Sequence, residues 1–357
     1  MKLNRRTVLF GLVGLGIPVA ASSCTNSTPQ TSSESPGAPT AASPDASPAP
    51  ASAAPEKIRI GYQVVPNAEL LAKALGLAQK AFPNSQIEYK SFDSGRDVNT
   101  AFAANGLDFG LAGSVPTSVG IARGLPYQVY FIHDVIGKAE ALIVKDNIKA
   151  IADIRGKKIA TPFGSTAHFS LLNLLELEKI DPSELTVLDL QPPDLVAAWQ
   201  RGDIDGGYLW QPNLSKLKAD GGTILVTSED LAAKGVVTAD VGIVSKDFAA
   251  KYPDAVKQYV AVLNEAIAEY RKDPDAAAAA IAKETGISPE ENKAAMTEII
   301  WLTSEEQKDV KYLGTASQPG DFAKVLKASA DFMVTQKTIP SAPELTAYQQ
   351  NIYSQAL

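Results

Sequence analysis

Hydroxyl side chains follow two apolar segments at the points where helices are expected to begin. Ser114 precedes Pro116 in the first of these places, and Ser165, Thr166 and His168 follow one another in the second. Proline is favoured in the first turn of a helix, and a serine just before a helix accepts hydrogen bonds from its first amides. Free amides at a helix N-terminus bind small anions, and hydroxyl or imidazole groups add donors. Ordinary helix capping explains each group equally well when it is taken alone.

A carboxylate and an aromatic ring flank a short apolar segment, residues 206–210. Asp205 directly precedes this segment and Trp210 ends it. Such a pair suits an ammonium group, because charge pairing adds to a cation–π attraction of about 0.5–2 kcal/mol. A solvated turn residue is the alternative interpretation of Asp205. His133, at the end of another apolar segment, is interpreted as a structural or rim residue.

The composition excludes several kinds of chemistry. The chain of 357 residues has one cysteine, Cys24, and two histidines, too few ligands for a zinc or iron–sulfur site. A formal charge of −7 argues against a nucleic-acid partner. The sequence has no Walker phosphate loop, no GxGxxG and no GxSxG motif, so nucleotide binding and serine hydrolysis are disfavoured. We expect no enzyme activity, no cofactor and no metal.

The N-terminal segment has the pattern of an export signal. Residues 1–23 carry basic residues near the start and then an apolar run that is shorter than the about 20 residues of a membrane-spanning helix. The run ends at Ala21-Ser22-Ser23-Cys24, which resembles a bacterial lipobox, so Cys24 is expected to carry a lipid. A plain secretory peptide with an incidental cysteine is the alternative. The export route, general secretory or twin-arginine, stays open.

Residues 24–56 differ from the rest in composition. They consist largely of Pro, Ser, Ala and Thr and contain almost nothing that can form an apolar core. We expect a disordered linker that tethers the folded part to a membrane through the lipid.

From Lys57 onward, strand-like and helix-like segments alternate. Strands are expected at residues 57–63, 87–92, 107–113, 127–133, 141–145, 158–161, 186–190, 206–210, 223–227 and 239–245. Helices are expected at residues 68–82, 166–178, 194–201 and 253–272. This alternation predicts mostly parallel sheets in two α/β lobes, with ligands at the carboxyl ends of the strands.

Residues 199–212, WQRGDIDGGYLWQP, resemble the same region in substrate-binding proteins of ABC importers. The match is to the taurine branch of the sulfonate/nitrate/taurine substrate-binding family. Further blocks agree in order and spacing: Tyr62-Gln63, Phe92-Asp93-Ser94-Gly95, Gly113-Ser114 with Pro116, Glu140-Ala141-Leu142, Ser165-Thr166 with His168, Leu190-Gln191-Pro192-Pro193, and Thr238 with Asp240-Val241. The resemblance covers nearly all of residues 57–340.

The resemblance implies a type II periplasmic-binding-protein fold, in which two α/β lobes are joined by two hinge strands with a ligand cleft between them. Lobe 1 is expected to comprise residues 57–138 and 242–357, and lobe 2 residues 139–241. The crossings are expected near Ile132–Lys145 and Thr238–Ser245.

The resemblance also implies the function and the partners. The protein is expected to be a monomeric, periplasmic binding protein, anchored through Cys24, that captures taurine and delivers it to a permease and its ATPase subunit. The alternative within the class is a binding protein for another alkanesulfonate or a small oxyanion such as nitrate. An enzyme is the second alternative. Pyrimidine-synthase relatives share the fold but carry a cysteine-rich segment, which this chain lacks. A tethered sensor domain is the third alternative.

Taurine is a zwitterion, and the resemblance assigns residues to each of its two ends. The sulfonate is expected to contact Ser114, Ser165, Thr166 and His168. The ammonium group is expected to contact Glu140, Asp205 and Asp240, with Trp210 and Gln63 lining the cleft. Only the resemblance points to Glu140, Asp240 and Gln63. Two positions depart from the taurine branch: Asn67 stands where an acidic residue is usual, and Gly242 where an aromatic is usual, which would enlarge the pocket or admit another sulfonate.

Overall fold

The computed structural model describes residues 54–357. The predicted signal segment, Cys24 and nearly all of the predicted linker therefore lie outside the described residues. Within this part of the chain, no helix is both long and apolar enough to cross a membrane.

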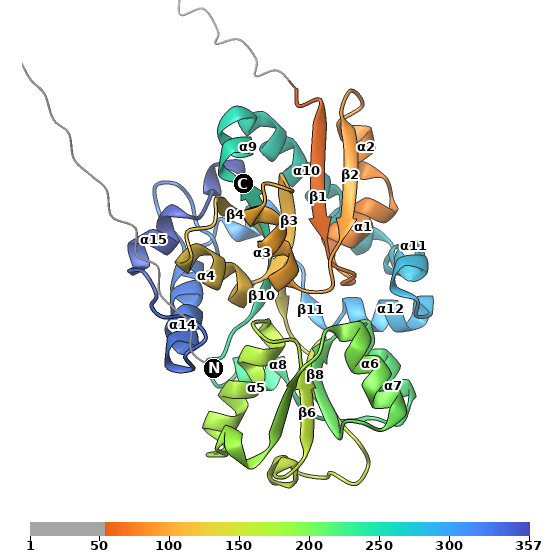
Figure 1. Ribbon diagram of the computed structural model, residues 1–357. Helices are drawn as coiled ribbons and strands as arrows, with labels where there is room; N and C mark the ends of the chain where they lie inside the picture. Colours follow the sequence, from red (N-terminus) through yellow and green to blue (C-terminus); the bar gives the residue numbers. More distant parts are fainter. Residues whose placement is uncertain (1–53) are drawn as a thin grey trace, which may run out of the picture. The chain divides into compact units, whose positions relative to one another are not determined.

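The first sheet has six strands in the order β11-β4-β10-β3-β1-β2 (Figure 1). The strands are β1 Lys57–Tyr62, β2 Gln86–Ser91, β3 Phe109–Gly113, β4 Tyr127–Ile136, β10 Ala239–Ser245 and β11 Ile299–Ile300. β3 is buried along its whole length, because helices cover both faces of the sheet. One apolar cluster joins the sheet to α1 and α10, and a second joins its other face to α3, α4 and α14.

The second sheet has five strands in the order β7-β6-β8-β5-β9. The strands are β5 Glu140–Val144, β6 Lys158–Thr161, β7 Thr186–Asp189, β8 Gly206–Trp210 and β9 Thr223–Thr227. Two further apolar clusters cover its faces, one with α5 and α8 and the other with α6 and α7. We call the first sheet with its helices lobe 1, and the second sheet with its helices lobe 2.

The helices fill the connections between the strands (Figure 1). They are α1 Ala68–Ala74, α2 Leu77–Ala81, α3 Gly95–Ala103, α4 Ser114–Ala122, α5 Thr166–Leu177, α6 Pro192–Arg201, α7 Asn213–Ala219, α8 Ser228–Ala232, α9 Lys246–Lys251, α10 Pro253–Lys272, α11 Pro274–Thr285, α12 Pro289–Met296, α13 Ser304–Gln307, α14 Phe322–Thr335 and α15 Leu345–Gln350. Three short 3-10 turns lie at Ile151–Ile154, Pro182–Glu184 and Ser354–Ala356.

Every predicted strand is present, several with the predicted bounds, but the expectation of mostly parallel sheets was wrong. Among the pairings of these strands, four are parallel and five antiparallel. Four of the antiparallel ones involve β10 or β5, which run against their neighbours after the chain has crossed between the sheets, and the fifth joins β11 to β4. The predicted helix 68–82 is two helices, because Gly76 has a φ of 65° between them.

The chain passes from lobe 1 to lobe 2 between β4 and β5, and returns between α8 and β10. Both passages fall within the predicted crossings or next to them. β10 pairs with β3 or β4 from Ala239 to Ser245, so residues 239–241 lie in the sheet of lobe 1. The predicted division into lobe residues otherwise stays a prediction.

Candidate ligand-binding site

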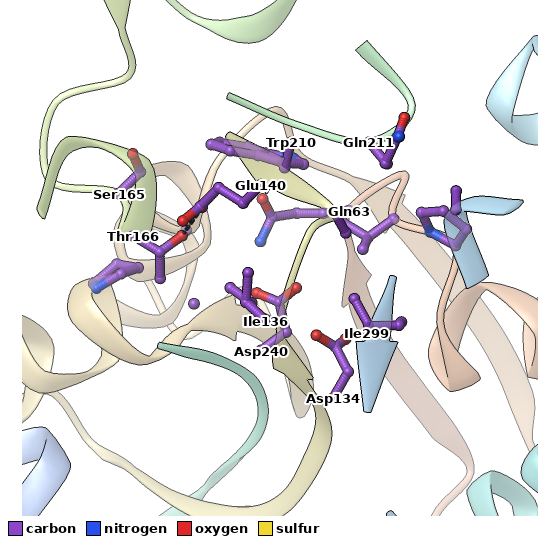
Figure 2. A pocket seen from close by; sticks show the side chains of 17 residues that line it. Gln63, Asp134, Ile136, Glu140, Ser165, Thr166, Trp210, Gln211, Asp240 and Ile299 are labelled. Atoms are coloured by element: carbon purple, nitrogen blue, oxygen red, sulfur yellow. Dashed lines mark hydrogen bonds between the residues drawn. The ribbon is translucent and has the colours of Figure 1, made fainter. Parts of the chain in front are cut away.

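A pocket lies where residues of the two lobes meet (Figure 2). Both lobes contribute side chains to its wall. Its lining comprises Gln63, Val65, Pro66, Gly95, Gly113, Pro116, Asp134, Ile136, Ala139, Glu140, Ser165, Thr166, Trp210, Gln211, Asp240, Ala295 and Ile299. Three of these residues are acidic and none is basic, so the wall offers full negative charges and only partial positive ones.

The partial positive charges come from the first turns of three helices. Gly95 begins α3, Pro116 lies in the first turn of α4, and Thr166 begins α5. Ser165 is the N-cap of α5, and its Oγ accepts a hydrogen bond from the amide of His168 at 3.1 Å. The first amides of a helix have no partner within it and point outward with the positive end of the dipole. This part of the wall therefore suits an anion.

Glu140 is held by hydroxyl groups from lobe 2. Thr166 Oγ1 donates to Glu140 Oε2 at 2.5 Å, and Ser228 Oγ donates to Oε1 at 2.7 Å. Ser170 Oγ lies 3.3 Å from the same oxygen. Complete burial raises the pKa of Glu140 to about 7, and these three donors oppose the rise because they favour the ionised form.

Asp134 and Asp240 form a second acidic group on lobe 1. They are directly paired in the antiparallel register of β4 and β10, and Figure 2 shows them next to each other. Asn67, the N-cap of α1, donates from Nδ2 to Asp134 Oδ2 at 2.9 Å, whereas Oδ1 of Asp134 is buried with no hydrogen-bond partner. Burial raises the pKa of Asp134 to about 7 and that of Asp240 well above its ordinary range, and the nearby acidic groups add to both shifts.

The structure brings six of the nine predicted ligand-binding residues to the pocket: Gln63, Glu140, Ser165, Thr166, Trp210 and Asp240. The register of β5 and β8 places Glu140 directly opposite Trp210, so the carboxylate and the indole are neighbours although 70 positions separate them. Gln63 is held by a hydrogen bond from its Nε2 to the carbonyl of Leu111 at 3.1 Å. Their contacts with a ligand remain predictions.

Ser114 and His168 do not line the pocket but support the segments that do. Ser114 Oγ accepts a hydrogen bond from the amide of Ala239 at 3.2 Å, which joins the start of α4 to β10. His168 Nδ1 accepts from the amide of Gly164 at 3.2 Å, and its ring stacks on Phe163 at 4.4 Å between centroids. Burial lowers the pKa of His168 to about 4, so the ring is neutral. Capping and loop support therefore describe both residues better than direct contact with a sulfonate.

The expected ammonium contact of Asp205 is corrected by the structure. Asp205 stands before the first residue of β8, whereas Trp210 is the last residue of that strand. Five residues of strand span about 17 Å, so the two side chains lie at opposite ends of the sheet. Asp205 Oδ2 instead accepts a hydrogen bond from the amide of Lys158 at 2.9 Å and so joins β8 to β6.

Sequence reasoning missed Asp134 and misjudged Gly242. The only signal for Asp134 was an acidic residue inside an otherwise apolar strand, next to His133, which drew attention instead. At Gly242, the position that a Cβ would take lies 2.7 Å from ring atoms of Tyr130. Tyr130 thus fills the space that an aromatic side chain at position 242 would take, and Gly242 does not enlarge the pocket.

Comparisons with known proteins agree with this architecture. The alkanesulfonate-binding protein SsuA from Xanthomonas axonopodis pv. citri, solved with MOPS bound, superposes with a TM-score of 0.70 at 25% identity, over 84% of this chain and 99% of that one. The periplasmic aliphatic sulphonate binding protein SsuA from Escherichia coli superposes with a TM-score of 0.68 at 24% identity, over 84% and 92% of the two chains. Fold and pocket thus define a two-lobed periplasmic-binding protein of type II, as predicted.

Sequence comparison identifies the family within this class of binding proteins. The model of the NMT1/THI5-like family matches residues 86–277, more than half of the chain. A taurine-binding periplasmic protein of Escherichia coli K12 is 32% identical over 290 residues, which cover 80% of this chain and 88% of that protein. The chain therefore belongs to the NMT1/THI5-like family, and its resemblance to taurine-binding proteins is confirmed.

Proposed function

We propose that this protein is the substrate-binding component of an ABC importer and that its ligand is taurine. The observation that carries the proposal is the composition of the pocket wall. It combines helix N-termini with three carboxylates, and its lining has no basic residue. Taurine has a sulfonate at one end and an ammonium group at the other, and therefore matches both kinds of group.

The sulfonate lies at the start of α5 in this proposal. The free amides of the first turn, with Ser165 at the N-cap, supply donors to its oxygens. The start of α3 at Gly95 adds a second positive dipole end from lobe 1. Since these groups are dipoles rather than cations, they stabilise a sulfonate through partial positive charges. They place no full positive charge in the pocket to repel the ammonium group.

The ammonium group lies among Glu140, Asp240 and Asp134, with the indole of Trp210 on one side. The hydroxyl donors of Glu140 favour its ionised form, and Glu140 is adjacent to Trp210 across β5 and β8. A carboxylate beside an aromatic face provides charge pairing and cation–π attraction together. A nitrate ion or a simple alkanesulfonate has no positive group for these acids, and this argues against both alternatives.

Capture requires closure of the lobes around the ligand. Residues of lobe 1 and lobe 2 line the pocket together, so the complete set of contacts exists only when the lobes are in contact. A ligand that binds the closed form more tightly shifts the population toward it, and the closed form is the one that a permease recognises in this proposal. The site of capture is the periplasm, as for the related taurine-binding protein.

Calorimetric titration of residues 54–357 tests the ligand. We expect taurine to bind most tightly, β-alanine and ethanesulfonate more weakly, and nitrate not at all. β-Alanine keeps the ammonium group but has a planar carboxylate, whereas ethanesulfonate keeps the sulfonate alone. Tighter binding of ethanesulfonate than of taurine would replace the proposal with the alkanesulfonate alternative.

The proposed membrane anchor rests on the sequence around Cys24, which lies outside the described residues. We propose that residues 1–23 are removed and that Cys24 is lipidated. Expression of the full chain and of a Cys24→Ser variant, followed by membrane fractionation and mass spectrometry, tests this. The lipid is expected as an added mass on the N-terminal peptide of the wild-type chain only, and recovery of unmodified wild-type protein in the soluble fraction would contradict it.

A further inference from the structure

Two carboxyl groups stand opposite each other on adjacent strands of lobe 1. Asp134 and Asp240 face each other as a directly paired position of adjacent antiparallel strands, and the side chains of such a pair lie on the same face of the sheet. Both line the pocket. Two neighbouring carboxylates repel each other, and with Asp134 fully buried a cation is needed to keep both ionised.

The hydrogen bonds distinguish this pair from Glu140. Glu140 receives three hydroxyl donors, which stabilise its charge. Asp134 receives one donor, from Asn67, and its Oδ1 is buried and unpartnered although the residue lines the pocket. An unpartnered carboxyl oxygen at the wall of a pocket points to a donor that arrives with the ligand.

Among residues 54–357, no cation faces the pair from the surrounding elements. On β4 the neighbouring His133 is buried and neutral, and its Nε2 lies 3.8 Å from Glu69 Oε2 of α1. Strands β3 and β11 and helix α4 contain no titratable side chain. Across the pocket the facing titratable group is Glu140, another acid.

Farther out, the charged groups are already paired. Lys73 of α1 forms an ion pair with Glu284. Near β11, Glu298 accepts a hydrogen bond from Gln211 Nε2 at 3.0 Å. On α13, Glu306 pairs with Arg271. Compensation for the second carboxylate must therefore come from the ligand.

We propose that Asp134 and Asp240 together read the ammonium group of the ligand, and that the pair gives up its shared proton to solvent when the ligand binds. In the free protein the pair holds one proton and one negative charge. An ammonium group placed between the two carboxyls supplies a positive charge and N–H donors, so that both groups are ionised in the complex. Asp134 thereby becomes a specificity-determining residue. This inference rests on the proposed function, because it requires a ligand with an ammonium group.

The sign of the pH dependence follows from the direction of proton movement. Protons compete with the ligand, so affinity rises with pH while the pair is being ionised and levels off above that range. The pKa of Asp134, raised by burial to about 7, places the rise between about pH 5.5 and 7.5. One released proton corresponds to a change of up to about tenfold in the dissociation constant per pH unit.

Calorimetry in buffers of different ionisation enthalpy measures the proton directly. Titration of residues 54–357 with taurine at pH 6.5 in phosphate and in imidazole is expected to show release of about 0.5–1 proton per taurine. Taurine binding with the same enthalpy in both buffers would overturn this inference and leave the proposed function standing. Absence of taurine binding would overturn the proposed function and this inference with it.

Variants assign the proton to the pair. Asp134→Asn is expected to weaken taurine binding about tenfold or more, to abolish proton release and to leave ethanesulfonate binding unchanged or improved. Asp205→Asn serves as the matched control, because it removes a carboxylate that does not line the pocket. This variant is expected to release protons as the wild type does. Proton release that survives in Asp134→Asn and disappears in Glu140→Gln would assign the proton to Glu140 and overturn the inference.

Discussion

At the scale of single residues, the donors around an acid decide its chemistry more than the acid itself. Glu140, Asp134 and Asp205 are all carboxylates, but each has a different environment. Glu140 accepts hydrogen bonds from three hydroxyl groups, Asp134 accepts one from a side-chain amide, and Asp205 accepts one from a backbone N–H. The donors around Glu140 therefore favour its charged form, the unpartnered oxygen of Asp134 leaves room for a donor from a ligand, and Asp205 makes a structural contact.

Glu140→Gln and Asp205→Asn test which of two carboxylates contacts the ammonium group. The structure favours Glu140, whereas the sequence also pointed to Asp205. We expect Glu140→Gln to weaken taurine about 10–100-fold, or about 1.4–2.8 kcal/mol, because the ammonium group loses its charged partner. Asp205→Asn is expected to change affinity less than twofold. Calorimetric titration of both variants with taurine and ethanesulfonate measures the difference. A large selective loss of taurine binding in Asp205→Asn would restore the expectation drawn from the sequence.

At the scale of elements, the corner between β3 and α4 meets the start of α5 at very short range. A Cβ at Gly113 would lie 2.8 Å from Thr166 Cγ2, closer than side chains approach each other. Gly113 has an ordinary φ of −63°, so the backbone itself accepts alanine. The glycine is therefore required by contact between the lobes and not by the turn.

Gly113→Ala is predicted to oppose closure without harming either lobe. Overpacking of this kind costs about 1–3 kcal/mol, so taurine and ethanesulfonate should both bind about tenfold more weakly. The free energy of unfolding without ligand, measured in urea, should change by less than about 0.5 kcal/mol, because the lobes can separate. A loss of stability as large as the loss of affinity would show that the contact matters to folding and not only to closure.

At the scale of the whole molecule, buried acids dominate the dependence of stability on pH. Burial raises the pKa values of Glu69, Asp134 and Glu140 to about 7, and it raises the pKa of Asp240 well above its ordinary range. A carboxyl with a raised native pKa stabilises the folded state below its unfolded pKa, and the contribution is lost as pH rises through the native value. The buried histidines act in the opposite direction, since burial lowers the pKa of His133 to about 3.

The unliganded protein is therefore predicted to be more stable at pH 5.5 than at pH 8, by a few kcal/mol. Each pKa unit corresponds to about 1.4 kcal/mol, and the four acids outweigh the two histidines in this range. Urea unfolding at both pH values measures the difference. Glu69→Gln, which removes an acid remote from the ligand but keeps the partner of Tyr259, is expected to reduce it. Higher stability at pH 8 would contradict the prediction.

The positions of the strands and of four helices were predictable, because apolar runs and helix-capping residues are local signals. Pro253–Lys272 and Gly206–Trp210 have the predicted bounds. The two-residue strand β11 carries too few residues for any pattern. Strand direction was not predictable from alternation alone, because β5 and β10 change direction where the chain crosses between the sheets.

What the sequence determined by itself is the list of elements, the family resemblance and the hydroxyl-bearing start of α5, since each depends on neighbouring residues. Only the tertiary structure decided which acids meet. The register of β4 and β10 joins Asp134 to Asp240, and that of β5 and β8 joins Glu140 to Trp210. The same strand β8 carries Asp205 away from the pocket. Register and direction arise from pairing between distant segments, and no local pattern encodes them.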